Sequence, residues 1–238
     1  SPNPAFSHVD VPLASTFLLS TKHGKETFVE PVIKGDRYSF VIKARKSKND
    51  QDANHGTSAG KRSAFRCLLS GVPITYEYIR EEARAGRMGA KLLAIVADGE
   101  RGRVFIAPTV EHEDAAARAK PQWKPDSEFF QKALGFRVGK YGMTKWSDIY
   151  TSRQLVLLTT FSDLIQQARE RVMSDARVAG LAEGDATKPS YAEAVSVYLS
   201  CAVGRLANAH SSLVGWINQN EAPRNTFARQ ALPMVWDF

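Results

Sequence analysis

The chain has 238 residues, of which 43% are hydrophobic, and its formal net charge is +7. It contains neither an apolar run of about 20 residues that could span a bilayer nor the charged start and apolar core of a signal peptide, so we expect a cytoplasmic protein. The positive charge favours acidic partners such as nucleic acid, although it is spread over a large chain.

Strand signals fill the first 44 residues. Runs of β-branched and aromatic residues are separated by the turn pairs His23-Gly24 and Gly35-Asp36, which predicts a small antiparallel meander. The expected strands are 16–21, 27–33 and 38–44. Residues 45–64 have almost no apolar content, and we expect a mobile loop there because they bury too little surface to offset the entropy of ordering.

Short elements are predicted between this loop and residue 120. Strands on either side of the turn 98–102 should pair as a hairpin, and Gly86 is placed to end a short helix. The expected elements are a strand at 65–69, a turn at 70–73, a helix at 76–85, strands at 91–97 and 103–107, and a polar helix at 109–119.

Two long helices are predicted in the second half of the chain. Thr151 with Gln154 forms a capping box for a helix to about residue 178, and Ser190 with Glu193 forms a second one. Apolar residues at spacings of three and four give both helices a stripe, so we expect an antiparallel hairpin. The stripes are Leu158, Phe161, Ile165, Ala168 and Val172, then Val195, Leu199, Ala202, Leu206, Ala209, Leu213 and Trp216.

The sequence carries none of the common catalytic signatures. It lacks the phosphate-binding GxxxxGK[ST] loop, a GxGxxG after a strand, HExxH and GxSxG. His112 stands among carboxylates, but adjacent helical residues point in different directions, so a solvated helix face is favoured over a metal site. We expect Cys201 to be an inert core residue and both cysteines to be reduced.

Two segments have the shape of zinc-binding knuckles that have lost their ligands. The stretch 67–71 has the form of CxxCG with Ser70 in place of the second cysteine, and 1–7 has the form of CPxxxCG without either cysteine. Tetrahedral zinc needs four thiolate or imidazole donors, and only Cys67 remains. We therefore expect a degenerate, metal-free site.

Several runs together resemble the middle part of adenine-specific DNA methyltransferases that carry an inserted zinc-ribbon-like region. The runs are 78–80, 85–90 and 94–97, then Gly135-Phe136-Arg137, Tyr141-Gly142-Met143-Thr144-Lys145-Trp146 and 227–238. With the first knuckle, these matches extend over essentially the whole chain. Members of that family resemble components of bacterial phage-defence islands.

The resemblance implies a noncatalytic insert rather than a complete enzyme. The family's glycine-rich cofactor loop and DPPY motif do not occur in these residues, so S-adenosylmethionine is implied only for a larger parent protein and no cofactor for this chain. Asn3-Pro4-Ala5-Phe6 looks like NPPF with one proline missing, but no strand precedes it and the knuckle explains it better. We expect the chain to be a piece of a longer protein that is inactive alone.

Basic and aromatic residues are the candidates for DNA contact. Cations would contact phosphates, and Trp146 or Tyr141 could stack on bases. The alternatives are that Trp146 is a buried anchor, that Arg87 caps helix carbonyls and that Arg229 pairs with a carboxylate. The candidate nucleic-acid-binding residues are Arg84, Arg87, Lys91, Arg137, Lys140, Tyr141, Lys145, Trp146 and Arg229. The basic ends of the loop, Arg45, Lys46, Lys48, Lys61 and Arg62, could embrace a phosphate backbone or be solvated.

These observations predict an α+β chain, with an antiparallel β-rich N-terminal part followed by a long antiparallel helical hairpin. The expected parts are a zinc-ribbon-like region at 1–108, a connecting seam at 109–150, a helical hairpin at 151–218 and an arm at 219–238 toward the missing methyltransferase core. The expected partners are DNA, that core and other defence-system subunits. The alternative function is a structural or protein-docking module without DNA contact.

Overall fold

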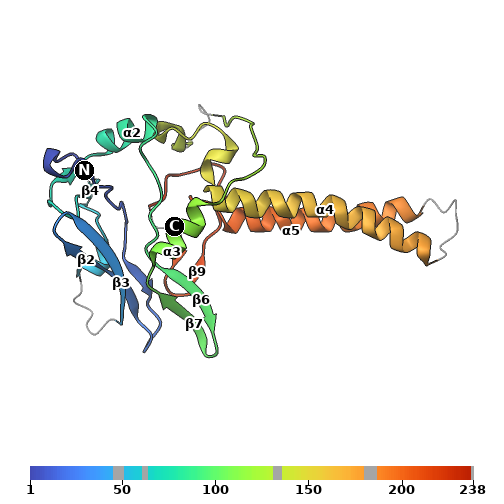
Figure 1. The fold of residues 1–238 in the computed structure, drawn as a ribbon, viewed down its shortest axis with the longest axis horizontal. Helices are drawn as coiled ribbons and strands as arrows, with labels where there is room; N and C mark the ends of the chain where they lie inside the picture. The colour runs from blue at the N-terminus through green and yellow to red at the C-terminus, as the bar shows by residue number, and fades with distance from the viewer. Residues whose placement is uncertain (45–50, 61–63, 131–135, 180–186, 237–238) are drawn as a thin grey trace.

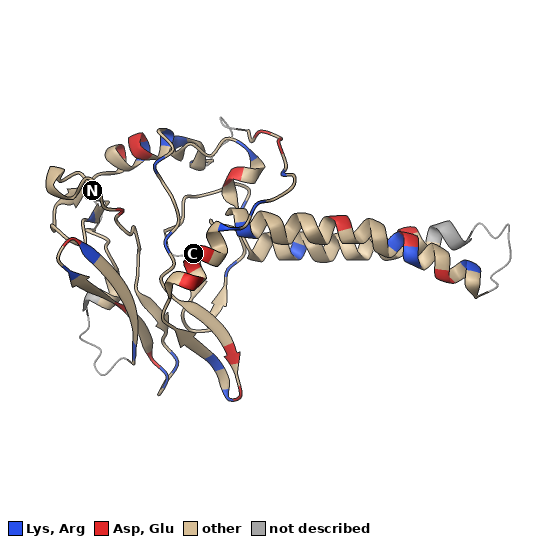
Figure 2. Cartoon of the chain, viewed as in Figure 1, with Lys and Arg blue, Asp and Glu red and all other residues tan. Residues whose placement is uncertain are grey.

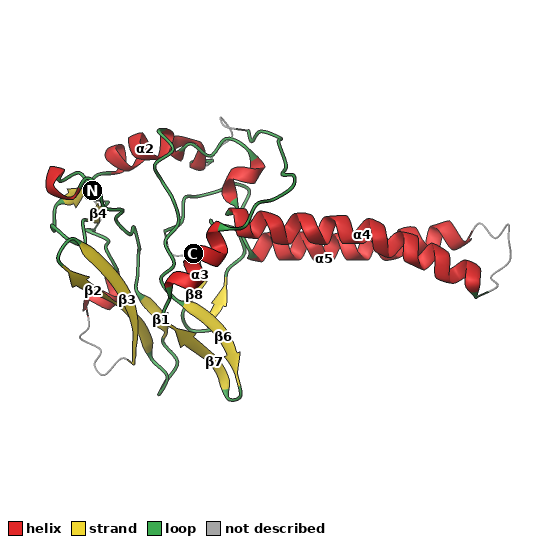
Figure 3. Cartoon of the chain, in the orientation of Figure 1, coloured by secondary structure: helices red, strands yellow, loops and turns green. Residues whose placement is uncertain are grey.

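The computed structural model describes residues 1–44, 51–60, 64–130, 136–179 and 187–236. A body of short strands, short helices and loops carries a pair of long helices that projects from one side of it (Figure 1). Strands occur only in the body among the described residues, and the projecting part is entirely helical (Figure 3). The predicted α+β class and the antiparallel helical hairpin are confirmed.

The N-terminal meander forms as predicted. Strands β1 (Leu18–Ser20), β2 (Thr27–Lys34) and β3 (Arg37–Ala44) pair antiparallel in the order β1-β2-β3. Val29 and Phe40 are buried on the face that also receives Phe17. Before the meander, the short 3-10 helix η1 (Pro4–Phe6) is capped by the side chain of Asn3.

Part of the predicted mobile loop is folded, which corrects that prediction for residues 51–58. Helix α1 (Gln51–His55) buries Ala53, and Gly56 turns at φ 56°, where a Cβ would lie 2.5 Å from the Ala14 oxygen. Thr57 is buried and donates its hydroxyl hydrogen to Pro12, at 3.0 Å. Residues 51–58 bury little apolar area, and hydrogen bonds to residues 12–14 hold them in place instead.

The first core cluster lies under α2. Strands β4 (Phe65–Arg66) and β5 (Pro73–Ile74) form a small hairpin, shorter than the predicted strand at 65–69. Helix α2 (Tyr76–Arg84) follows, capped by Thr75 and closed by Gly86 at φ 74° as predicted. The buried members of this cluster are Ala64, Phe65, Cys67, Ile74, Ile79, Ala83 and Tyr141.

The predicted hairpin and polar helix are also present. Strands β6 (Ile95–Gly99) and β7 (Gly102–Ile106) pair antiparallel, although β6 begins four residues later than the expected strand. Helix α3 (Val110–Ala117) is surface-exposed, and His112 reaches back to Thr109 at its start. Two 3-10 helices, η2 (Val138–Tyr141) and η3 (Trp146–Ile149), lead to the long helices.

Helix α4 (Ser152–Val178) begins at the predicted capping box, since Thr151 accepts from the Gln154 amide and the Gln154 side chain accepts from the Thr151 amide. Helix α5 (Thr187–Ala209) begins three residues before the predicted cap at Ser190. Pro189 therefore lies in the first turn, where its missing N–H leaves no hydrogen bond unmade.

The second apolar stripe ends earlier than predicted, because α5 stops at Ala209. Leu213 is buried in the second core cluster, and Trp216 lies in a short hairpin of β8 (Trp216–Ile217) and β9 (Ala222–Pro223). The backbone amide and hydroxyl of Ser212 both donate to the Ile149 oxygen at 2.8 Å, which returns the chain to the body. Phe161 of the first stripe stays 42% exposed, so it lies outside the buried face of α4.

The segment expected to be an arm toward missing protein packs on this chain, which is a further correction. Leu232 is 2% exposed in the second cluster, and Trp236 lies on Phe65 and Tyr141 in the first. Met234 contacts both clusters. The high apolar content of this segment predicts contact with another protein, but its apolar side chains pack on the core clusters of the same chain.

Candidate nucleic-acid interface

The end of α2 and the 3-10 helix η2 lie against each other and bring basic residues together. Gly142 follows η2 with φ 77°, and a Cβ there would lie 3.0 Å from the Ala83 oxygen and 3.6 Å from the Arg84 Cα. Because only glycine tolerates this approach at positive φ without strain, Gly142 lets the end of α2, which carries Arg84, pack against the end of η2, which carries Lys140.

Arg80 lies one turn before Arg84 and is held between two aromatic rings. Its guanidinium carbon is 5.6 Å from the Tyr141 ring centroid and 5.8 Å from that of Tyr76. The Arg80 Nε is buried and makes no hydrogen bond in the described part of the chain. Cation–π contact with both rings fixes the position of this positive charge beside Arg84.

Sequence reasoning assigned Tyr141 to base stacking, and the structure corrects this. Tyr141 is only 6% exposed, and its ring packs on Trp236 at 5.4 Å. A base cannot reach a ring covered in this way. Arg80 was missed, although its spacing of four residues from Arg84 was a signal that both lie on one helix face.

Three of the predicted cations are already paired with carboxylates. Arg87 makes two hydrogen bonds to Glu82, at 2.7 and 2.8 Å, and this contact raises the pKa of Arg87 and lowers that of Glu82. Lys91 pairs with Glu113 at 2.6 Å, and Lys145 pairs with Asp126. These pairs are exposed, so a phosphate could compete for the cations only by displacing a carboxylate.

Trp146 is an anchor between segments rather than an open platform. Its half-buried ring lies 4.8 Å from Phe129 and 6.2 Å from Phe227, in the geometry of packed aromatic clusters. Of the two alternatives left by the sequence, the structure favours the buried anchor. Arg229 is exposed in the turns after Phe227, and no described carboxylate pairs with it.

Three exposed cations remain at the junction of α2 and η2. Arg84, Arg137 and Lys140 form no ion pair with a carboxylate in the described ranges. Arg137 and Lys140 are three residues apart in a 3-10 turn, so their side chains project from one side. With Arg80 they form what we call the basic edge. Figure 2 shows that α2 carries both blue and red segments. The basic residues 45, 46, 48, 61 and 62 lie outside the described residues.

The two degenerate knuckles lie together. The Ser1 hydroxyl donates to the Cys67 sulfur at 3.3 Å, and the turn after Cys67 is closed by a 2.8 Å bond from the Gly71 amide to the Cys67 oxygen. Burial alone would raise the pKa of Cys67, but hydrogen bonds from Ser1 and Ser70 outweigh it and lower the pKa. One thiol with hydroxyl neighbours does not fit the donor set of zinc.

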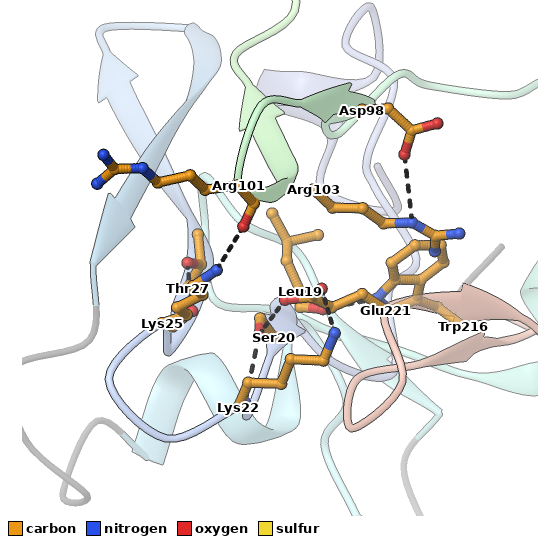
Figure 4. Close-up of polar contacts among 10 residues, drawn as sticks. All are labelled: Leu19, Ser20, Lys22, Lys25, Thr27, Asp98, Arg101, Arg103, Trp216 and Glu221. Atoms are coloured by element: carbon orange, nitrogen blue, oxygen red, sulfur yellow. Dashed lines mark hydrogen bonds and ion pairs between the residues drawn. The ribbon is translucent and has the colours of Figure 1, made fainter.

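A buried carboxylate joins the N-terminal meander to the β8–β9 hairpin (Figure 4). Glu221 is 3% exposed and accepts hydrogen bonds from the Ser20 hydroxyl at 2.7 Å and the Lys22 ammonium at 2.6 Å. The Lys22 hydrogen bond is the main cause of the lowered pKa of Glu221. Ser20 is fully buried, so no substrate can reach its hydroxyl, and we interpret the group as structural.

Comparisons with protein-family models, with curated proteins and with solved structures find no match to this chain. Among the described helices, none combines the length and the hydropathy required to cross a membrane. The basic edge is therefore interpreted from its own geometry.

Proposed function

We propose that this chain is a noncatalytic, DNA-engaging insert of a cytoplasmic adenine-specific DNA methyltransferase, and that it contacts DNA phosphates through the basic edge. The single observation that carries DNA contact is the gathering of Arg84, Arg137 and Lys140, exposed and without carboxylate partners in the described chain, beside Arg80. The sequence resemblance supports the parent enzyme.

The geometry of the basic edge suits a phosphate backbone better than a base. Its cations come from two rigid elements that Gly142 holds in contact, so little side-chain and backbone order has to be gained on binding. Of the two aromatic rings that contact Arg80, Tyr141 is packed in the core, and Tyr76, which is 39% exposed, has the Arg80 guanidinium over its ring. Contacts of this kind give affinity and position without reading sequence.

Methyl transfer itself belongs to the rest of the parent protein in this proposal. The parent would supply the S-adenosylmethionine site and the pocket for the extruded adenine. The role of this chain is to hold the duplex by its backbone.

The test is the salt dependence of DNA binding by the full chain and by R84A/R137A/K140A. Fluorescence anisotropy of a labelled duplex should show salt-sensitive binding by the wild type. Each lost phosphate contact lowers the slope of log K against log salt by about 0.9, so the triple variant should lose up to about 2.7 of that slope.

The matched control is K34A/R37A/K120A, which removes the same charge from exposed positions in the β2–β3 turn and after α3. Its slope of log K against log salt should be nearly that of the wild type, because charges farther than a Debye length from the DNA contribute little to binding. Equal losses in both variants, or no salt-sensitive binding by the wild type, would overturn the proposal.

A protein-docking role is the second candidate, and one observation favours it. Helix α5 exposes Tyr191, Val197 and Tyr198, at 65%, 61% and 78%, on a part of the molecule that projects from the body (Figure 1). Large exposed apolar side chains grouped on one element mark interaction sites.

A further inference from the structure

Helix α5 lacks the charged outer face of a solvent-exposed helix. Among its 23 residues only Lys188, Glu193 and Arg205 are charged, whereas α4 has seven charged residues among 27. Figure 2 shows the hairpin as mostly tan over the length where both helices run side by side. A helix that is uncharged around most of its circumference is normally buried on more than one side.

The buried side of α5 faces α4, and a side about 120° around the helix from it carries a second regular pattern. Ala192 is fully buried, and Val195 and Leu206 are half-buried on the side that faces α4. The positions of the second pattern alternate at spacings of three and four residues, as in the seam of a helical bundle. They are Tyr191, Ala194, Tyr198, Cys201 and Arg205, all exposed, which also corrects the expectation that Cys201 is core.

Helix α4 adds apolar residues to the same side of the hairpin. At 100° per residue, Phe161, Leu164 and Ala168 lie about 100° around α4 from the line that faces α5, on the side where Tyr191 and Tyr198 project. Phe161 and Leu164 are 42% and 44% exposed. We call the set Phe161, Leu164, Ala168, Tyr191, Ala194 and Tyr198 the outer apolar face.

We propose that the outer apolar face binds the same face of a second copy of this chain, so that two hairpins form an antiparallel four-helix bundle with the bodies at opposite ends. A symmetric, self-complementary patch is what a two-fold dimer requires. The inference does not depend on DNA binding.

The overlap of two hairpins is large enough for a stable dimer. A helix of 23 residues is about 35 Å long, and two helices side by side are about 20 Å wide, so overlap over the full length of the hairpin, with the outer apolar face at its centre, covers about 700 Å² on each copy. Two copies would bury about 1,400 Å² in total, within the range of specific interfaces and above that of most crystal contacts.

The positions of the residues along the hairpin favour the antiparallel arrangement. The Arg169–Glu193 ion pair, at 3.6 Å, shows which levels of the two helices match. A two-fold axis that places the bodies at opposite ends crosses the hairpin and stacks each helix on its own counterpart. With the axis midway between the levels of Leu164 and Ala168, Leu164 packs on the small Ala168 of the second copy, and Tyr198 packs on its Ala194. A parallel pairing would instead place Leu164 on Tyr198 and Ala168 on Ala194, so large residues would meet large ones and small residues small ones.

Sedimentation equilibrium of the full chain tests the proposal. The wild type should reach twice the 26.3 kDa of one chain as its concentration rises. Y198E should raise the dimer dissociation constant at least about 100-fold, because a carboxylate would be buried without a partner near the two-fold axis. A wild type that stays monomeric at about 100 μM would overturn the proposal.

The matched control is V197E, at the adjacent position on a different side of α5. Val197 is 61% exposed, so the substitution adds the same charge outside the proposed interface and should change the constant less than about threefold. Both side chains are exposed, and helical circular dichroism should be unchanged in both variants. Equal weakening by V197E and Y198E would overturn the use of this face.

A size exchange tests the antiparallel arrangement. L164A and A168L should each weaken the dimer about 5- to 10-fold, and L164A/A168L should restore it, because a large side chain again meets a small one across the interface. A double variant no better than the single ones would overturn this arrangement.

Discussion

The body and the hairpin are stabilised in different ways. In the body, contacts join residues far apart in the chain: Ser20 bonds to Glu221, and Phe65 packs on Trp236. In the hairpin beyond its base, α4 and α5 pack chiefly on each other (Figure 1). The body therefore should unfold as one cooperative unit, whereas the hairpin can open locally. The hairpin also exposes apolar surface that a partner could cover.

The largest expected effect breaks the body at Phe65, which is 2% exposed between Tyr76 and Trp236. Phe65→Ala leaves a cavity and should lower the free energy of unfolding by about 3–5 kcal/mol. Urea unfolding should show the loss in all body probes together. Phe130→Ala is the matched control, since Phe130 is 78% exposed, and an equal loss there would contradict the assignment of Phe65 to the core.

The next effect concerns Glu221, which ties the two ends of the body together. Glu221→Gln removes the charge from hydrogen bonds to Ser20 and Lys22 and should cost about 1.5–3 kcal/mol at neutral pH. The pKa of Glu221 is lowered by folding, so this contribution is present above the ordinary value of 4.5 and is lost as the pH falls through the folded pKa.

Urea unfolding of wild type and Glu221→Gln over this pH range measures the contribution. The difference in the free energy of unfolding should shrink as the pH falls below 4.5, because wild-type Glu221 is then increasingly protonated. A difference that is constant with pH would show that the carboxylate charge does not stabilise the body.

A smaller effect is expected at Gly142, where the body forms the basic edge. Gly142→Ala places a Cβ 3.0 Å from the Ala83 oxygen at φ 77° and should cost about 1–2 kcal/mol. DNA affinity should fall as well, since Lys140 moves relative to Arg84. Gly89→Ala is the control, because a Cβ there meets nothing within 4 Å.

The smallest expected effect is on the hairpin alone, at the start of α4. Thr151→Ala removes the cap of α4 and should cost about 1 kcal/mol. Hydrogen exchange should speed up in the first turns of α4 while the amides of β2 and β3 keep their protection. A uniform increase over both regions would mean that hairpin and body open together.

The elements that were predicted correctly from the sequence are those that depend on residues close together in the chain. The capping box at Thr151, the meander turns and the hairpin at 98–102 all depend on residues within a few positions of each other, and all were predicted correctly. Helix α1 was missed because its support, the bonds of Thr57 to Pro12 and Ala14, comes from more than 40 residues away.

The candidate site shows the same division. Charge and spacing located Arg84, Arg137 and Lys140 correctly on the surface, but could not show that Lys91 pairs with Glu113, 22 positions later. The burial of Tyr141 depends on Trp236, which no local pattern links to it. The DNA-binding assignment itself stays a prediction.

The antiparallel course of α4 and α5 makes their reach adjustable. Deleting seven residues from each helix at matched levels preserves the seven-residue phase of both apolar lines and shortens the arm by about 10 Å. No bond within the body changes, because the chain re-enters it where Ser212 meets Ile149. The α4–α5 hairpin is thus a spacer whose length can change without changing the structure of the body.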